Sequence, residues 1–112
     1  MKIIFGSAQL GFKYGIKKKK INNKELSKIY KILKPNTLSF FDTAINYGNS
    51  QKRIGDLRLN KKVITKIKLP IGREKKNFKL WFNKMLIKSF KDLKIKKLYG
   101  LLIHDTSDIL KK

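Results

Sequence analysis

Two groups that could exchange a proton stand close together in the segment "FFDTAINYGNSQ", residues 40–51. Asp42 ends an apolar run, and Tyr47 follows five residues later in a turn rich in Gly and Asn. Lys66 lies inside the apolar segment "VITKIKL", where a strand position is normally apolar. His104 is the single histidine and follows the apolar run "LYGLLI". We call these four residues the four-residue cluster and treat them as candidates for acid–base chemistry.

Together these side chains have the properties of a site that protonates an oxygen atom. Lys66 beside Asp42 would form a partly buried ion pair, the usual way in which a buried charge is tolerated. The lysine ammonium would favour the ionised form of the nearby Tyr47 phenol, which makes that phenol a usable general acid. His104 could donate a hydrogen bond to a carbonyl oxygen and fix its orientation. Singly, each residue has an ordinary structural explanation, such as an Asx turn at Asp42, so the interpretation depends on their joint placement.

Four short apolar runs could position the cluster. They are nearly continuous rather than alternating, which is typical of parallel strands covered on both faces, and they span residues 3–5, 38–41, 63–67 and 98–103. Because the carboxyl ends of parallel strands meet at one rim of a barrel, Asp42, Lys66 and His104 are expected at the same rim, with Tyr47 in the loop above.

Helical patterns separate the runs. Asn22 and Glu25 form a variant capping box before a helix that Pro35 ends. Ser50 is expected to cap a short helix that reaches Leu57, and Asn77 is expected to cap a longer one. The apolar stripe of that longer helix is expected to lie in the core: Phe78, Trp81, Phe82, Met85, Leu86 and Leu93.

The resulting order, β-α-β-α-β-α-β, predicts a single α/β domain over residues 1–112 with a parallel sheet. An open doubly wound sheet and the first half of a (β/α)8 TIM barrel both fit this order. No stretch carries the spaced glycines of a dinucleotide-binding or P-loop motif, which weakens the doubly wound alternative. We therefore predict four parallel strands with alternating helices, the first half of a barrel.

The charge of the chain, +22 over 112 residues, raises the question of anionic partners. Of the 29 basic residues 26 are lysine, whereas nucleic-acid recognition favours arginine, and the lysines form no stripe on one helix face. We predict a cytoplasmic protein with no specific nucleic-acid partner, no membrane span and no metal site. The alternative is a non-catalytic, lysine-rich remnant or binding module for anionic partners on the same βα scaffold.

The segment "FFDTAINYGNSQKRIG" resembles the aldo/keto reductase signature, and "GSAQLGFKYGI" is similar to the first-strand region of one branch of that superfamily. "VITKIKLP" resembles the strand that carries the family's lysine, and "SFKDLKIKKLYGLLIH" resembles the helix and strand that lead to its histidine. The matches follow in the family's order along nearly the whole chain, which is more specific than any single motif.

The resemblance implies that Asp42, Tyr47, Lys66 and His104 are a catalytic tetrad that reduces an aldehyde or ketone with NADPH or NADH. It implies that Tyr47 protonates the carbonyl oxygen and that Ser7 and Asp42 lie near the nicotinamide end of the cofactor. Gln51 stands where the family often has Glu, and we expect this change at the surface, with little consequence.

The resemblance also implies a barrel of about 250 residues, so this chain corresponds to a domain that is incomplete at its C-terminus. Four strands cannot close a barrel and leave two edges with unpaired N–H and C=O groups. We therefore expect the isolated chain to be weakly stable and to lack full activity alone. We also expect it to associate with another copy of itself or with a complementary half-barrel.

Overall fold

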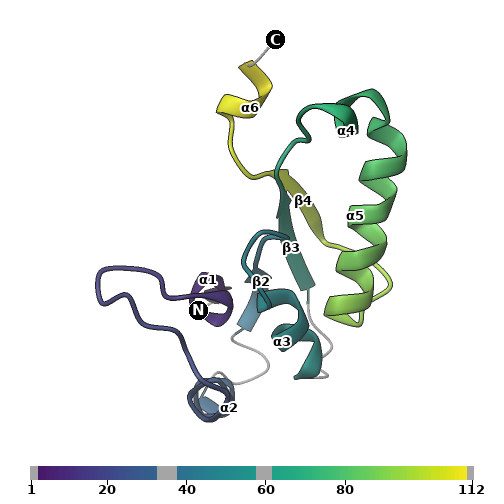
Figure 1. The fold of residues 1–112 in the computed structure, drawn as a ribbon. Coiled ribbons are helices and arrows are strands. Elements are labelled where there is room, and N and C mark those ends of the chain that lie inside the picture. The colour runs from purple at the N-terminus through teal and green to yellow at the C-terminus, as the bar shows by residue number, and fades with distance from the viewer. Residues whose placement is uncertain (1–2, 33–37, 58–61, 111–112) are drawn as a thin grey trace.

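The computed structural model describes residues 3–32, 38–57 and 62–110. Within these ranges the chain forms one four-stranded sheet in the order β1-β2-β3-β4, and every pairing is parallel. The strands are β1 (Ile3–Gly6), β2 (Leu38–Asp42), β3 (Lys62–Ile67) and β4 (Gly100–Ile103) (Figure 1). The prediction of four parallel strands with alternating helices is thereby confirmed, although β4 begins two residues later than its apolar run.

Six helices are described, and three of them are short turns that the sequence patterns did not indicate. The longer ones are α2 (Asn23–Ile32), α3 (Ser50–Asp56) and α5 (Phe78–Leu93), and the short ones are α1 (Ala8–Gly11), α4 (Arg73–Lys76) and α6 (Ser107–Leu110). None of the helices within the described ranges combines the length and the apolar character that a membrane span requires.

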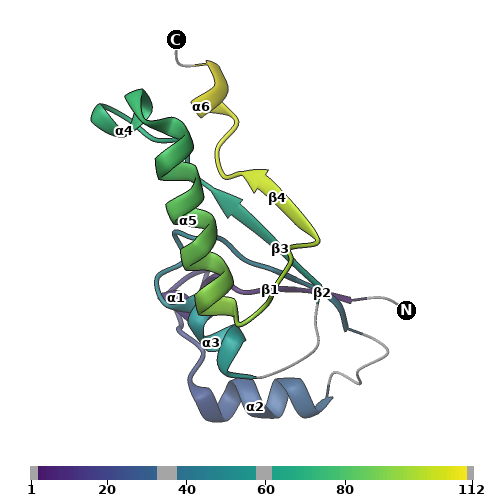
Figure 2. The ribbon, with the colours of Figure 1, turned by 90° about the vertical axis from the view of Figure 1, so that its right-hand side faces the viewer.

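Helices α2, α3 and α5 lie on the same side of the sheet (Figure 2). The core lies between these helices and the sheet and consists of Leu10, Leu26, Phe41, Ile54, Val63 and Leu93. The other side, which we call the inner face, carries no helix in the described part of the chain, and Ile4 and Leu102 there are 59% and 51% exposed. The continuous apolar runs favoured strands covered on both faces, and within the described residues only the face that carries the helices is covered. In β3, buried and more exposed residues alternate, as in a sheet with one packed face.

The strands are staggered along the sheet. A row of paired residues runs from Gly6, the last residue of β1, through Asp42 and Ile64 to Gly100, the first residue of β4. From Asp42 onward, each step across the sheet therefore meets an earlier position of the next strand. This stagger is what tilted strands produce when a sheet curves toward a barrel.

One of the predicted helix starts needs correction, and two have the expected residue at the cap position. Asn22 and Glu25 form the expected capping box, because each backbone N–H donates to the other's side chain at 2.9 Å. Ser50 does not cap α3: it is the first helical residue, and Asn49 occupies the cap position without a side-chain hydrogen bond. Asn77 occupies the cap position of α5, as predicted, although its side chain makes no capping hydrogen bond. The predicted stop at Pro35 lies outside the described residues.

The apolar stripe of α5 is less buried than expected. Of its six residues only Leu93 belongs to the buried core, and Phe78 is 46% exposed. The reason is where α5 makes its contacts: its C-terminal part crosses α3 closely at Gly55. A Cβ atom at Gly55 would lie 2.1 Å from the carbonyl oxygen of Asp92. The N-terminal half of α5 extends beyond this crossing, so its aromatic side chains pack mainly on one another.

Candidate active site

The carboxyl ends of β2 and β3 bring Asp42 and Lys66 together. Asp42 is the last residue of β2, and Lys66 lies near the end of β3 on the same inner face. The Lys66 ammonium donates to the Asp42 carboxylate, and the two side chains are 19% and 37% exposed. Lys66 Nζ also lies 3.4 Å from the carbonyl oxygen of Thr43. The predicted ion pair is present and is partly shielded from water.

Tyr47 and His104 complete the four-residue cluster. Lys66 Nζ lies 5.5 Å from the centroid of the Tyr47 ring. The His104 ring meets the Tyr47 ring edge-on, with 5.5 Å between centroids and an interplanar angle of 88°. The backbone N–H of His104 donates to the carbonyl of Ile67 at 2.8 Å, which holds His104 at the end of the β3–β4 ladder. The structure thus places the carboxylate, the ammonium, the phenol and the imidazole beside one another.

One nitrogen of His104 is buried and lacks a partner. Nδ1 makes no hydrogen bond to any described residue. The backbone hydrogen bond to Ile67 and the contact with the Tyr47 ring therefore orient the imidazole, whereas no side chain in this part of the structure fixes its tautomer.

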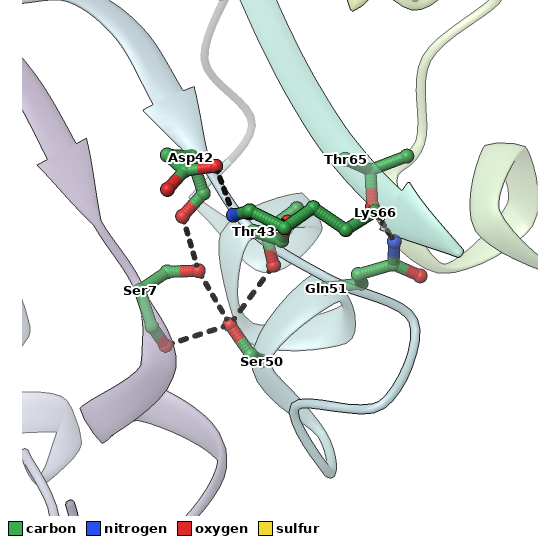
Figure 3. A network of polar contacts seen from close by, with 7 residues as sticks. All are labelled: Ser7, Asp42, Thr43, Ser50, Gln51, Thr65 and Lys66. Carbon is green, nitrogen blue, oxygen red and sulfur yellow. Dashed lines mark hydrogen bonds and ion pairs between the residues drawn. The ribbon is translucent and has the colours of Figure 1, made fainter. Parts of the chain in front are cut away.

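Ser7 lies beneath the cluster in a network of buried hydroxyl groups (Figure 3). Its Oγ donates to the carbonyl oxygen of Asp42 at 2.9 Å. Ser50 Oγ lies 2.9 Å from both the carbonyl oxygen and the Oγ of Ser7, and 3.3 Å from Thr43 Oγ1. The side chain of Ser7 is 1% exposed, so its hydroxyl is engaged in joining β1 to the end of β2. The contact of Ser7 with a cofactor stays a prediction.

Gln51 is buried rather than superficial, which corrects the expectation from the sequence. It is 4% exposed; its Nε2 donates to Thr65 Oγ1 at 2.8 Å, and its Oε1 accepts from Ser89 Oγ at 3.2 Å. The amide therefore joins α3 to β3 and to α5. Thr65 immediately precedes Lys66, so this network supports the strand that carries the ammonium (Figure 3).

Replacement of Gln51 by alanine is expected to lower the free energy of unfolding by about 1–3 kcal/mol, because two buried hydroxyl groups lose their partner. Urea denaturation measures this change. The matched control is Gln9→Ala, which also removes an amide, but one that bonds to the carbonyl of Tyr14 in an exposed setting. The control is expected to shift stability by about 0.5 kcal/mol or less. Equal losses in the two variants would contradict the burial of Gln51.

Arg53 is a further structural residue that the sequence patterns did not reveal. Its Nη1 lies 2.6 Å from the carbonyl oxygens of both Leu10 and Ile21, and its Nε lies 3.1 Å from Asn23 Oδ1. Burial lowers the pKa of the Arg53 guanidinium below its usual value, because a buried cation loses hydration. Arg53 thus holds the long segment between α1 and α2 against α3.

The loop that carries Tyr47 also touches the segment after β1. A Cβ atom at Gly11 would lie 1.6 Å from the carbonyl oxygen of Tyr47, so only glycine fits this approach. Gly48 takes the left-handed conformation with φ of 54° at the same crossing. The ring of Phe12 packs edge-on against Tyr47, with 5.7 Å between centroids. Tyr47 is therefore held by α1 on one side and by His104 and Lys66 on the other.

The fold is that of the first half of a (β/α)8 barrel. Two solved structures from Pseudomonas aeruginosa share it: PA4992, a candidate aldo-keto reductase, with a TM-score of 0.73, and a candidate aldo-keto reductase with a TM-score of 0.72. Each is 18% identical in sequence to this chain and matches 97% of it. The chain spans 46% and 44% of the lengths of these two proteins. No protein-family model and no curated protein matches the sequence.

Proposed function

We propose that this chain is the proton-transferring half of an aldo/keto reductase, which reduces an aldehyde or ketone with NADPH or NADH. The observation that carries the proposal is the position of the Tyr47 ring, which contacts both the Lys66 ammonium and the His104 imidazole. The barrel fold supports it, because barrel enzymes place their chemistry at the carboxyl ends of the strands, where these residues lie.

The residues present fit the nicotinamide end of such a cofactor. The partly exposed Asp42 carboxylate, already paired with Lys66, is a polar group suited to contact an amide and a ribose. No described loop at this rim has the spaced glycines that cradle phosphates. Phosphate and adenosine binding would thus fall to the barrel half that this chain does not span. The net charge of +22 would assist the approach of an anionic cofactor.

Each residue of the cluster has a defined role in this proposal. The reduced nicotinamide, when bound, supplies the hydride for the carbonyl carbon. Tyr47 donates its phenolic proton to the carbonyl oxygen as negative charge develops there. His104, whose Nδ1 is buried, would present Nε2 to the same oxygen and orient it. Lys66 stabilises the phenolate that Tyr47 leaves behind, and Asp42 holds Lys66 in place.

The test uses one polypeptide in which this chain is joined to the second half of the PA4992 barrel. We expect oxidation of NADPH that depends on added aldehyde, followed by the loss of absorbance of the reduced nicotinamide. A folded fusion that binds NADPH but oxidises it with none of a panel of aldehydes and ketones would contradict the proposed function.

A further inference from the structure

An open groove lies between the start of α2 and the exposed side of α3, and it shares no residue with the four-residue cluster. Its volume is about 530 Å³. Asn49, Lys52, Arg53 and Asp56 line it from α3 and its cap, at the spacing of three and four residues that places side chains on one face of a helix. Three cations and three amides stand in its wall: Lys20, Lys52, Arg53, Asn22, Asn23 and Asn49.

Arg53 is a partly buried cation without a counter-ion in the described part of the chain. Its Nη1 and Nε bond to uncharged oxygens, namely the carbonyls of Leu10 and Ile21 and the side-chain oxygen of Asn23. Its Nη2 is buried and makes no hydrogen bond to a described residue. Cations removed from water are normally paired with an anion. Arg53 therefore gives the groove a fixed positive charge that no described carboxylate pairs with.

The acidic groups closest to the groove are already paired with other lysines. Asp56 accepts from Lys94 Nζ at 2.7 Å, and Glu25, in the first turn of α2, accepts from Lys19 Nζ at 2.5 Å. The hydrogen bond from Lys19 lowers the pKa of the Glu25 carboxyl, which keeps that pair charged.

The two lysines of the groove have no such partner. Lys20 and Lys52 are exposed, and neither forms an ion pair with a described residue. Together with Arg53 they bring three positive charges to one groove. A single carboxylate would leave two of these charges without a partner, so the groove suits an anion that carries more than one charge.

We propose that this groove binds a small molecule that carries a phosphate group. The phosphate oxygens would accept hydrogen bonds from the Lys20 and Lys52 ammonium groups and from the asparagine amides, and such charge-assisted bonds are the strong ones. Because its Nη2 is covered, Arg53 contributes charge rather than a direct contact. The volume falls within the range of small-molecule sites, about 300–1,000 Å³. The site does not depend on the reductase activity proposed above.

Isothermal titration calorimetry of the whole chain with inorganic pyrophosphate, at constant ionic strength, tests the proposal. We expect saturable binding of one equivalent. The double variant Lys20→Gln with Lys52→Gln should bind about tenfold more weakly. The matched control is Lys84→Gln with Lys91→Gln, which removes the same charge from exposed positions of α5 and should leave the affinity nearly unchanged. Equal losses in the two variants, or several equivalents bound, would show only the general attraction of a chain with a net charge of +22 and would overturn the proposal.

Nuclear magnetic resonance of the wild-type chain locates the bound anion even if a variant fails to fold. Pyrophosphate is expected to shift the side-chain amide signals of Asn22, Asn23 and Asn49 most. The amides of Asn77 and Asn83, at the start of α5 and within it, are internal controls and should shift little. Shifts of equal size at all five amides would overturn the site. Tighter binding of citrate, which carries its charges on carboxylates, would overturn the assignment to phosphate.

Discussion

Replacing Tyr47 by phenylalanine in the completed barrel is expected to lower kcat for aldehyde reduction by roughly 10²–10⁴-fold, the usual contribution of a general acid. The substitution removes only the hydroxyl. The ring keeps its edge-on contacts with Phe12 and His104, so the fold and substrate binding should change little. Steady-state kinetics with saturating NADPH measure the effect, which we expect in kcat rather than in KM.

The matched control is Tyr99→Phe. Tyr99 is 62% exposed, and its ring packs on Phe40, which pairs with the first residue of β3, far along the sheet from the cluster. Loss of that hydroxyl should leave kcat unchanged. Equal rates for wild type and Tyr47→Phe would remove Tyr47 from the role of the acid, whatever the fold.

Gly11→Ala is expected to cost more stability than any other glycine-to-alanine change near the cluster. Its Cβ would overlap the carbonyl oxygen of Tyr47, a backbone atom that cannot turn away. Overpacking usually costs about 1–3 kcal/mol, and an overlap with backbone falls at or above the upper end. Urea denaturation measures the loss. Because the displaced atom belongs to Tyr47, kcat in the completed barrel should fall as well.

Gly6→Ala is the control for this prediction. A Cβ atom at Gly6 meets nothing within 4 Å, and Gly6 lies in β1 without a positive φ. The free energy of unfolding of the Gly6→Ala variant should therefore differ from that of the wild type by less than about 1 kcal/mol. Similar losses at the two glycines would show that the close approach of Gly11 to the Tyr47 loop is absent in solution.

The sequence predicted the strands and the neighbourhood of the four-residue cluster because both depend on local signals. Short, nearly continuous apolar runs mark strands, and a polar residue at the end of each run marks the rim where parallel strands finish. The capping box before α2 was also predictable, since Asn22 and Glu25 are three residues apart and bond directly to each other.

The errors concern contacts between distant parts of the chain. The sequence predicted that Gln51 lies at the surface, because a polar side chain in the first turn of a helix usually faces water. Its burial depends on Thr65 and Ser89, which lie on β3 and α5. Ser50 was expected to be a helix cap because serine is common at that position, whereas its hydroxyl is bonded to Ser7, the residue that follows β1. The stripe of α5 predicts an amphipathic helix correctly but not how far along the helix the core reaches.

The segment between β2 and α3 limits which insertions and deletions the protein can accept as its sequence evolves. The backbone N–H groups of Thr43 and Ile45 continue the ladder beyond β2 by donating to Ile64 and Lys66, and Ser50 N–H donates back to Tyr47. The segment is thus tied down on both sides of Tyr47, and adding or deleting one residue there would move Tyr47 out of its place. New substrate preferences would therefore have to arise through insertions in other loops, while the length of this segment stays constant.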